Sequence, residues 1–222
     1  MDLKPYFLKY EALSKATDQV FERVRQEFPD CVQCKAECSD CCYALFDLTL
    51  IEALYLNEKF KAKFKDQDRE RLLEKANRTD RRIHKIKREA YRELKAGKSE
   101  DEILSDLGGV RVRCPLLNDQ DLCDLYEHRP ITCRLYGIPT SIGGKGRTCS
   151  LSKFKDGTAY PTADLDKIHG RLQEISAELL RDLQSANIKL ADILMPLSMA
   201  MITEFDDTFM GIDDSSSEEE TA

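Results

Sequence analysis

The sequence predicts a mainly α-helical fold, in which helices pack around a small cysteine-rich metal centre of irregular or β-hairpin structure. Long segments of helical hydrophobic periodicity recur along the chain, and no alternation of strand and helix patterns is visible. All nine cysteines fall in two sets, Cys31–Cys42 and Cys114–Cys149. We therefore expect one helical domain over residues 1–212, with a cysteine-cluster core formed by residues 31–56 and 110–150.

The composition indicates a soluble globular protein with a buried core. The chain has 222 residues, of which 41% are hydrophobic and 34% are charged. The longest apolar stretch, residues 193–202, is shorter than the roughly 20 residues that a bilayer-spanning helix needs. The first residues lack the pattern of a signal peptide. We expect a cytoplasmic protein without a membrane segment, and in that compartment clustered cysteines bind metal more often than they form disulfides.

Charge is distributed unevenly along the chain. The formal net charge is −7, yet residues 61–98 carry fifteen Lys and Arg against seven Asp and Glu. Residues 213–222 contain five acidic residues and no large apolar side chain, so we expect a disordered acidic tail. The basic segment could contact nucleic acid or an acidic partner, but acidic residues interrupt it. We expect a solvated helix face rather than nucleic-acid binding, and leave an unknown protein partner open.

The N-terminal part of the chain predicts two helices around the first cysteine set. Apolar residues recur at helical spacing over residues 5–28, and Pro29 ends that helix. Thr49 and Glu52 form a capping-box pattern, in which each side chain pairs with the backbone N–H of the other residue. A second helix should therefore begin there and run to about residue 62.

The middle of the chain predicts a long helix and a short one. Apolar residues follow one side of residues 66–96, while the other side is charged. Ser99 and Glu102 form another capping box, and Gly108 with Gly109 ends the short helix that follows.

The second cysteine set is expected on a strand pair and a short helical turn. Residues 110–117 have the pattern of a strand, the Asn-Asp pair at 118–119 forms a turn, and residues 122–125 return. Pro130 begins a helical turn that carries Cys133.

The last third of the chain predicts a loop and two helices. The glycine-rich residues 143–146 form a loop, or the turn of a hairpin, before Cys149. An amphipathic helix starts at Thr162, and a final helix spans residues 188–203.

The cysteine spacing itself indicates a metal site. Thiolate sulfur is the shared ligand of structural zinc and of iron–sulfur clusters, and a C-x-x-C loop lets two sulfurs converge on one ion. Cys31 with Cys34, and Cys38 with Cys41, form two such pairs. Adjacent cysteines normally point apart, so Cys41 and its neighbour Cys42 could serve different metals or different faces of one site. The alternative is a group of buried free thiols.

The cysteine motifs also resemble a known family. An opening with Cys38-x-x-Cys41-Cys42, then Cys114-Pro, then Cys123-x-x-Tyr126-x-x-Arg129-Pro130-x-x-Cys133-Arg134, is similar to the YkgJ-type cysteine-cluster family, whose CxxCxxCC domain is described as zinc- or iron-chelating. The resemblance covers residues 31–56 and 110–150. This chain departs from the family pattern by one extra residue between Cys34 and Cys38 and by the additional Cys31.

The resemblance implies eight metal ligands and leaves Cys31 aside. They are Cys34, Cys38, Cys41, Cys42, Cys114, Cys123, Cys133 and Cys149. Eight thiols could form two four-sulfur sites, or one site with structural or redox cysteines beside it. Arg129 and Arg134 flank Cys133, so we expect them in an outer shell that neutralises thiolate charge, with ordinary surface arginines as the alternative. His128 could also coordinate.

Three functions remain open at this point. The first is a cysteine-cluster metalloprotein that binds an iron–sulfur cluster, expected as [4Fe–4S], with a redox or cluster-dependent role. The second is a zinc-stapled, non-catalytic interaction module. The third is an iron–sulfur-dependent protein lysine methyltransferase, because a similar cysteine module recurs in flagellin lysine N-methylases. The sequence indicates no substrate, catalytic residue or reaction, so enzymatic activity is left undecided.

Overall fold

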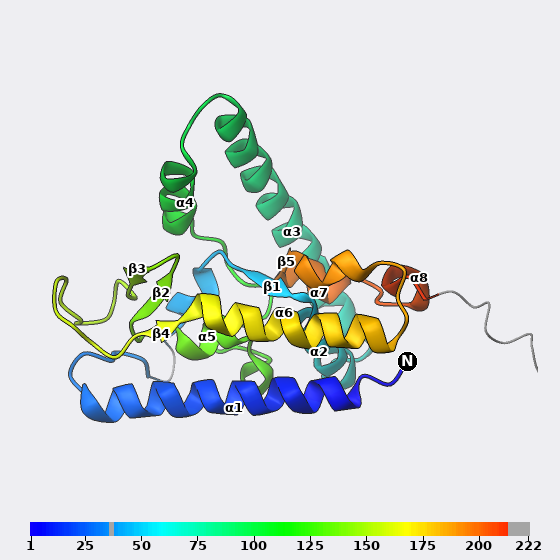
Figure 1. The fold of residues 1–222 in the computed structure, drawn as a ribbon, viewed down its shortest axis with the longest axis horizontal. Coiled ribbons are helices and arrows are strands. Elements are labelled where there is room, and N and C mark those ends of the chain that lie inside the picture. Colours follow the sequence, from blue (N-terminus) through cyan, green and yellow to red (C-terminus); the bar gives the residue numbers. More distant parts are fainter. Residues whose placement is uncertain (36–37, 213–222) are drawn as a thin grey trace, which may run out of the picture.

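The computed structural model describes residues 1–35 and 38–212, and it confirms the mainly α-helical fold with only short strands (Figure 1). The expected tail at residues 213–222 lies outside the described residues. The α-helices are α1 (Lys4–Glu27), α2 (Leu50–Lys63), α3 (Asp66–Lys95), α4 (Glu100–Gly109), α5 (Ile131–Leu135), α6 (Leu165–Asp182), α7 (Leu197–Ile202) and α8 (Asp207–Met210). The 3-10 helices are η1 (Asp40–Tyr43), η2 (Tyr126–His128) and η3 (Ile188–Asp192). The strands are β1 (Asp47–Thr49), β2 (Thr140–Ile142), β3 (Lys145–Arg147), β4 (Ala163–Asp164) and β5 (Leu194–Pro196).

Helix α2 lies at the centre of the fold, between two hydrophobic cores. Leu50, Ile51 and Leu54 belong to a first core that α1 and α6 complete. Leu56 and Phe60 belong to a second core that α3 and α7 complete. A helix that is apolar on most of its sides is typical of a buried position. The segment that carries Cys41 and Cys42 leads through β1 into this central helix.

Helices α3 and α4 form an arm that projects from the body of the molecule (Figure 1). Leu72 and Ala76 are buried near the base of α3, which packs against α7. Beyond the buried Ile83, α3 contacts α4, whose Ile103 is its one buried residue. The arm therefore exposes most of the long charged helix to solvent.

The predicted helix starts are confirmed in their hydrogen bonds. The backbone N–H of Thr49 donates to Glu52 Oε2 over 3.3 Å at the start of α2. At the start of α4, the N–H of Ser99 donates to Glu102 Oε2 over 3.1 Å, and the N–H of Glu102 donates to Ser99 Oγ over 3.3 Å. Helix α4 ends at Gly109, as the sequence predicts.

The strand expected at residues 110–117 is wrong. This segment is irregular and makes only isolated bridges, between Ala44 and Arg111 and between Leu117 and Cys123. Pro115 has no N–H to donate to a ladder, which limits regular pairing. The expected turn does form at Asn118, whose N–H donates to the carbonyl of Leu122 over 2.9 Å.

The single helix expected at residues 188–203 is also wrong. The chain instead forms η3, the strand β5 and the short helix α7. Pro196 cannot donate a helical hydrogen bond, and β5 pairs antiparallel with β1. The hairpin before Cys149 is confirmed as β2 and β3, and β4 adds in parallel to β2. Over the described residues, no helix combines the length and the apolarity that a bilayer crossing requires.

Candidate metal centre

Backbone pairing brings the two cysteine sets together. The N–H of Cys114 donates to the carbonyl of Cys42 over 2.7 Å, and the N–H of Val112 donates to the carbonyl of Tyr43 over 3.0 Å. The segment that carries Cys114 therefore lies against η1, which carries Cys41 and Cys42. Residues more than seventy positions apart in the sequence become neighbours in this way.

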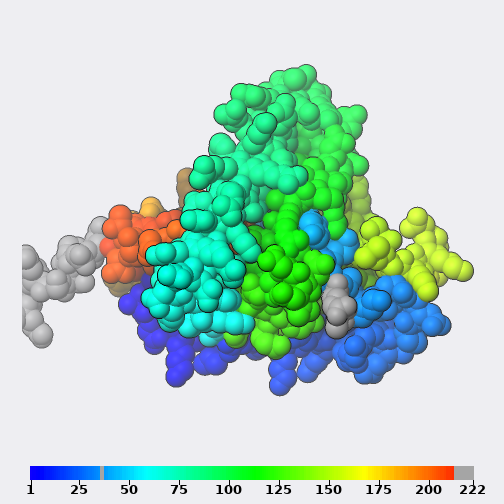
Figure 2. Space-filling view, turned by 180° about the vertical axis from the view of Figure 1, so that it is seen from behind, coloured from blue at the N-terminus to red at the C-terminus, as the bar shows by residue number. Residues whose placement is uncertain are grey.

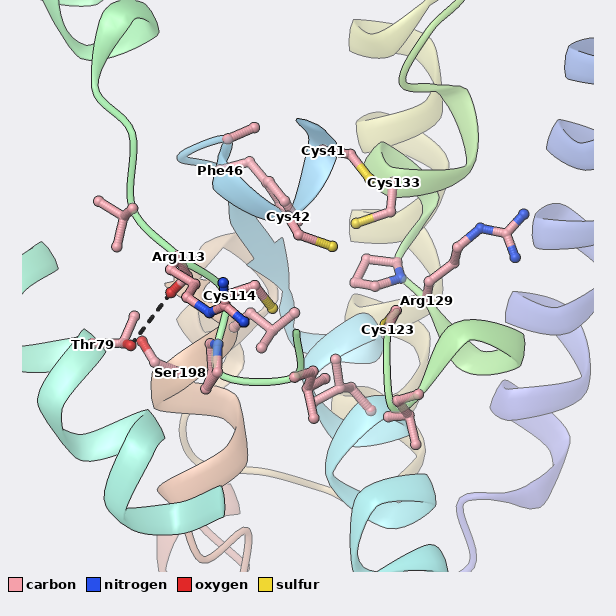
Figure 3. A pocket seen from close by; sticks show the side chains of 18 of the residues that line it. Cys41, Cys42, Phe46, Thr79, Arg113, Cys114, Cys123, Arg129, Cys133 and Ser198 are labelled. Carbon is pink, nitrogen blue, oxygen red and sulfur yellow. Dashed lines mark hydrogen bonds between the residues drawn. The ribbon is translucent and has the colours of Figure 1, made fainter. Parts of the chain in front are cut away.

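Five cysteines line one partly enclosed cavity with a volume of about 50 Å³ (Figure 3). They are Cys41, Cys42, Cys114, Cys123 and Cys133. Much of the remaining wall is apolar, with Leu56 from α2, Ile83 from α3 and Leu197 from α7. An apolar wall offers few hydrogen-bond partners and disfavours charge, so thiols there interact mainly with one another or with a bound cation.

A side-chain-stabilised turn positions Cys123. The Asn118 side-chain oxygen accepts from the N–H groups of Gln120 and Leu122, each over 3.0 Å. The Asn118 amide group also donates to Asp124 Oδ1 over 2.9 Å. These bonds close the loop tightly and return the chain at Cys123 to the cavity.

A buried carboxylate positions Cys133. Glu52 Oε1 accepts from the N–H of Ile131 over 3.1 Å, while Glu52 Oε2 accepts from Thr49 Oγ1 over 3.1 Å. Burial raises the pKa of Glu52, and the hydrogen bonds from Ile131 and Thr49 act in the opposite direction. This side chain therefore joins the start of α2 to the start of α5, and Cys133 lies in the middle of α5.

The thiols in the cavity shift one another's pKa values. The neighbouring thiols of Cys133 and Cys42 lower the pKa of Cys41 to about 3. In return, Cys41 raises the pKa of Cys42 and of Cys133. Burial raises the pKa of Cys114 to about 12. These shifts favour a thiolate at Cys41, with protonated thiols around it until a cation replaces their protons.

Three other predicted ligands form an outer group beside this cavity. Burial raises the pKa of Cys34 to about 12, and the neighbouring thiols Cys38, Cys149 and Cys41 raise it further. Cys149 Sγ lies 3.3 Å from Asp40 Oδ2 and accepts from a backbone N–H over 3.4 Å. Cys41 is thus near both groups. The ninth cysteine, Cys31, neither lines the cavity nor is among the thiols that raise the pKa of Cys34.

A glycine makes room for Cys34. Gly137 has φ +106°, and a Cβ built on it would lie 2.2 Å from Cys34 Sγ. The Cys34 thiol donates to the carbonyl of Tyr136 over 3.4 Å. The outer group therefore depends on a position that only glycine fills without displacing a sulfur.

The two arginines that the sequence placed in an outer shell both contact helix α1. Arg129 lines the cavity, but its guanidinium turns away from the cysteines, stacks 4.0 Å from the Tyr126 ring and lies 3.6 Å from Asp18 (Figure 3). Arg134 contacts the same carboxylate over 2.6 Å. Both arginines brace the loop around Cys133, and charge neutralisation by them stays a prediction.

Sequence reasoning missed two other arginines, which precede Cys114 directly. Arg113 lines the cavity and donates to the Tyr43 hydroxyl over 2.9 Å. Arg111 contacts Asp40 Oδ1 over 2.5 Å, and Asp40 in turn lies against Cys149. The signal that could have found them is the pair of cations immediately before a candidate ligand.

His128 also lines the cavity, as an additional ligand would. Its Nδ1 lies 3.1 Å from the Tyr55 hydroxyl, which donates to Glu11 Oε1 over 2.9 Å. This chain of contacts orients the imidazole from α1 and α2. Coordination by His128 stays a prediction.

The donor set fits a thiophilic metal, because five sulfurs face one small apolar space and soft thiolates select zinc, copper(I) or iron–sulfur clusters. Among residues 1–35 and 38–212, no three Cys, His, Asp or Glu side chains already stand in the arrangement of a metal-ligand set. Binding at this centre therefore requires side chains to move inward as they lose their protons.

Comparison with known proteins agrees with this geometry. The sequence profile of the CxxCxxCC family, described as a putative zinc- or iron-chelating domain, matches residues 33–150, which is more than half of the chain. No curated protein matches the chain, and neither does any solved structure. The matched residues include both cysteine groups and the backbone pairing that joins them. The chain therefore belongs to the CxxCxxCC family of zinc- or iron-chelating cysteine-cluster domains.

Proposed function

We propose that this protein binds an iron–sulfur cluster, of the [4Fe–4S] type, and has a redox or cluster-dependent role in the cytoplasm. The observation that carries the proposal is the convergence of five thiols, from three separate parts of the chain, on one apolar cavity. One structural zinc needs four ligands. A fifth sulfur in the same space, with three more beside it, suits a larger inorganic group or a pair of them. A bound cluster would supply one-electron transfer.

The backbone around the cavity suits thiolate ligands. The backbone at Leu116 and Leu117 acts to lower the pKa of the Cys114 thiol, and the backbone at Leu125 acts to lower the pKa of Cys123. These effects favour the charged sulfur and partly offset the effect of burial. Four thiolates around [4Fe–4S]²⁺ carry a net charge near −2, and these backbone groups would help to stabilise it. The chain thus binds the group, excludes water from it and stabilises its charge.

We assign the ligands to two neighbouring groups. The inner group is Cys42, Cys114, Cys123 and Cys133. The outer group is Cys34, Cys38, Cys41 and Cys149. The assignment rests on the shared cavity of the inner group and on the mutual effect of the outer thiols on the pKa of Cys34. Cys41, whose pKa the inner thiols Cys133 and Cys42 lower, lies at the junction between the groups.

The deciding experiment is anaerobic purification of the full chain, followed by an absorption spectrum and by counts of iron, acid-labile sulfide and zinc. We expect a brown protein with a broad band near about 400 nm and with iron and sulfide in equal amounts. A colourless protein with stoichiometric zinc would overturn the proposal. All nine cysteines are free thiols in the structure, which is consistent with a reducing compartment.

A zinc-stapled interaction module is the second candidate. The cavity volume of about 50 Å³ favours it, because that space suits a single ion without further opening of the walls. In this case the projecting arm of α3 and α4 would be the interaction surface. A cluster-dependent lysine methyltransferase rests on the sequence resemblance alone.

A further inference from the structure

One face of α3 carries a continuous row of positive charge, which we call the basic stripe. Its members recur every three or four residues, apart from the adjacent Arg81 and Arg82, so they share a side of the helix. They are Arg71, Lys75, Arg78, Arg81, Arg82, Lys85, Arg88, Arg92 and Lys95. The buried side chains Leu72, Ala76 and Ile83 lie on the opposite side. At 1.5 Å per residue, the stripe runs for about 36 Å along the arm.

Within the described part of the chain, most cations of the stripe form no ion pair. There, two ion pairs involve it, between Arg71 and Asp68 at 3.8 Å and between Arg78 and Glu74 at 3.7 Å. All four of these side chains are more than 60% exposed, and exposed pairs of this length are weak. A row of solvated cations on a protein with net charge −7 is a surface that a negatively charged segment would neutralise.

We propose that the basic stripe is the docking surface for the acidic segment 213–222 of the same chain. This segment carries five carboxylates and no basic residue. Its five negative charges are opposite in sign to the nine positive charges of the stripe. The proposal does not depend on which metal the cysteine centre binds.

The starting point of the segment supports the proposal. It follows Ile212, directly after α8, and Phe209 of α8 packs in the second hydrophobic core together with Leu72 and Ala76 of α3. Figure 2 shows the orange C-terminal helices against the cyan base of the arm. The tether therefore begins beside the base of the stripe.

The length of the acidic segment limits its contact to the part of the stripe near the base of the arm. Ten extended residues span at most about 36 Å, and the acidic residues 218–220 lie six to eight residues beyond Ile212. We therefore expect them at Lys75 and its neighbours, and not at Lys95, which lies at the far end of the arm. Tethering gives the segment an effective concentration on the order of millimolar, so weak ionic contacts suffice.

Zero-length carbodiimide cross-linking of the metal-loaded full chain, read by mass spectrometry, tests this. We expect intramolecular links from residues 213–220 to Lys75 or Lys85, none to Lys95, and at least a several-fold loss of these links at about 0.5 M NaCl, where the screening length is about 4 Å. A variant with all five acids neutralised (D213N, D214N, E218Q, E219Q, E220Q) is the control for labelling. In it, Lys75 should react with an acetylating reagent several-fold faster than in the wild type, with Lys95 unchanged.

Four results would overturn the proposal. Links only to lysines of α1 or η3, such as Lys9 and Lys189, would place the segment elsewhere. Links between differently labelled chains in a mixed sample would make a second copy the occupant. Equal acetylation rates of Lys75 in the wild type and in the neutralised variant would show that the segment does not cover the stripe. Binding of a nucleic-acid oligomer with the same affinity to both proteins would also show that the segment does not cover the stripe.

Discussion

The Glu52 carboxylate and the backbone N–H of Ile131 form a buried hydrogen bond of 3.1 Å between two helix starts. Ile131 is the first residue of α5, so this bond fixes the short helix that carries Cys133. Only 3% of Glu52 is exposed. The capping box of α2, which the sequence predicts, thus also positions a residue of the cysteine centre, which the sequence does not reveal.

Replacing Glu52 by Ala should destabilise the protein and weaken its metal centre. The change leaves the N–H groups of Ile131 and Thr49 without their buried acceptor, at a cost of about 1–3 kcal/mol for each unsatisfied group. Urea unfolding of the reduced, metal-loaded protein measures the free energy, and metal counts after dialysis measure retention. Glu58→Ala is the matched control, because Glu58 lies on the same helix with a side chain that is 50% exposed. Equal losses in both variants would mean that the bond to α5 has no special role.

Gly137→Ala should displace Cys34 and disturb the outer thiol group. The new Cβ would lie 2.2 Å from the Cys34 sulfur, and a backbone φ of +106° is strained for any residue other than glycine. Gly143 is the matched control, with φ +57° and no heavy atom within 4 Å of a Cβ there. Gly143→Ala should cost about 1–2 kcal/mol from backbone strain alone. We expect a larger loss for Gly137→Ala, with reduced metal content, and a similar loss in both variants would contradict the contact with Cys34.

Single cysteine substitutions should separate the two ligand groups. Cys133→Ser removes an inner sulfur and should abolish metal binding at the cavity, with a lower melting temperature because metal binding and folding are coupled. Cys149→Ser should remove only the outer share of the metal. Cys31→Ser should leave the metal content unchanged, because Cys31 neither lines the cavity nor raises the pKa of Cys34. Metal counts and thermal melts of the three variants measure this, and unchanged metal in Cys133→Ser would remove that residue from the ligand set.

The sequence predicts the helices well because local patterns determine them. The capping boxes at Thr49 and Ser99, and the long amphipathic run of α3, depend on neighbours a few residues away. The segment around Cys114 was predicted as a strand because its composition fits one. Its actual partner is η1, more than seventy residues upstream, and no local pattern encodes that pairing.

The same reasoning applies to the metal centre. Clustering of cysteines indicates that sulfurs gather, and the structure brings five of them to one cavity. The direction of an arginine side chain depends on partners that are distant in sequence. Arg129 and Arg134 flank Cys133, yet the guanidinium groups of both contact Asp18 of α1. Arg113, which the sequence did not single out, lines the cavity as Arg129 does. Adjacency to a ligand therefore predicts the neighbourhood of an arginine and not its contact.

The metal-free, reduced protein should lose stability as the pH rises above 9, and Cys114 should account for part of the loss. Burial raises the pKa of Cys114 from 9.0 to about 12, so between these values the folded state keeps a proton that the unfolded chain releases. The unfolded state then binds fewer protons, and the free energy of unfolding falls with pH, with the full contribution present below pH 9. From pH 8 to pH 10 the loss from this one thiol is about 1 kcal/mol. Urea unfolding of the metal-free wild type and of Cys114→Ala at both pH values measures it. The variant should lose less than the wild type, and an identical pH dependence in the two proteins would show that the thiol already titrates normally in the fold.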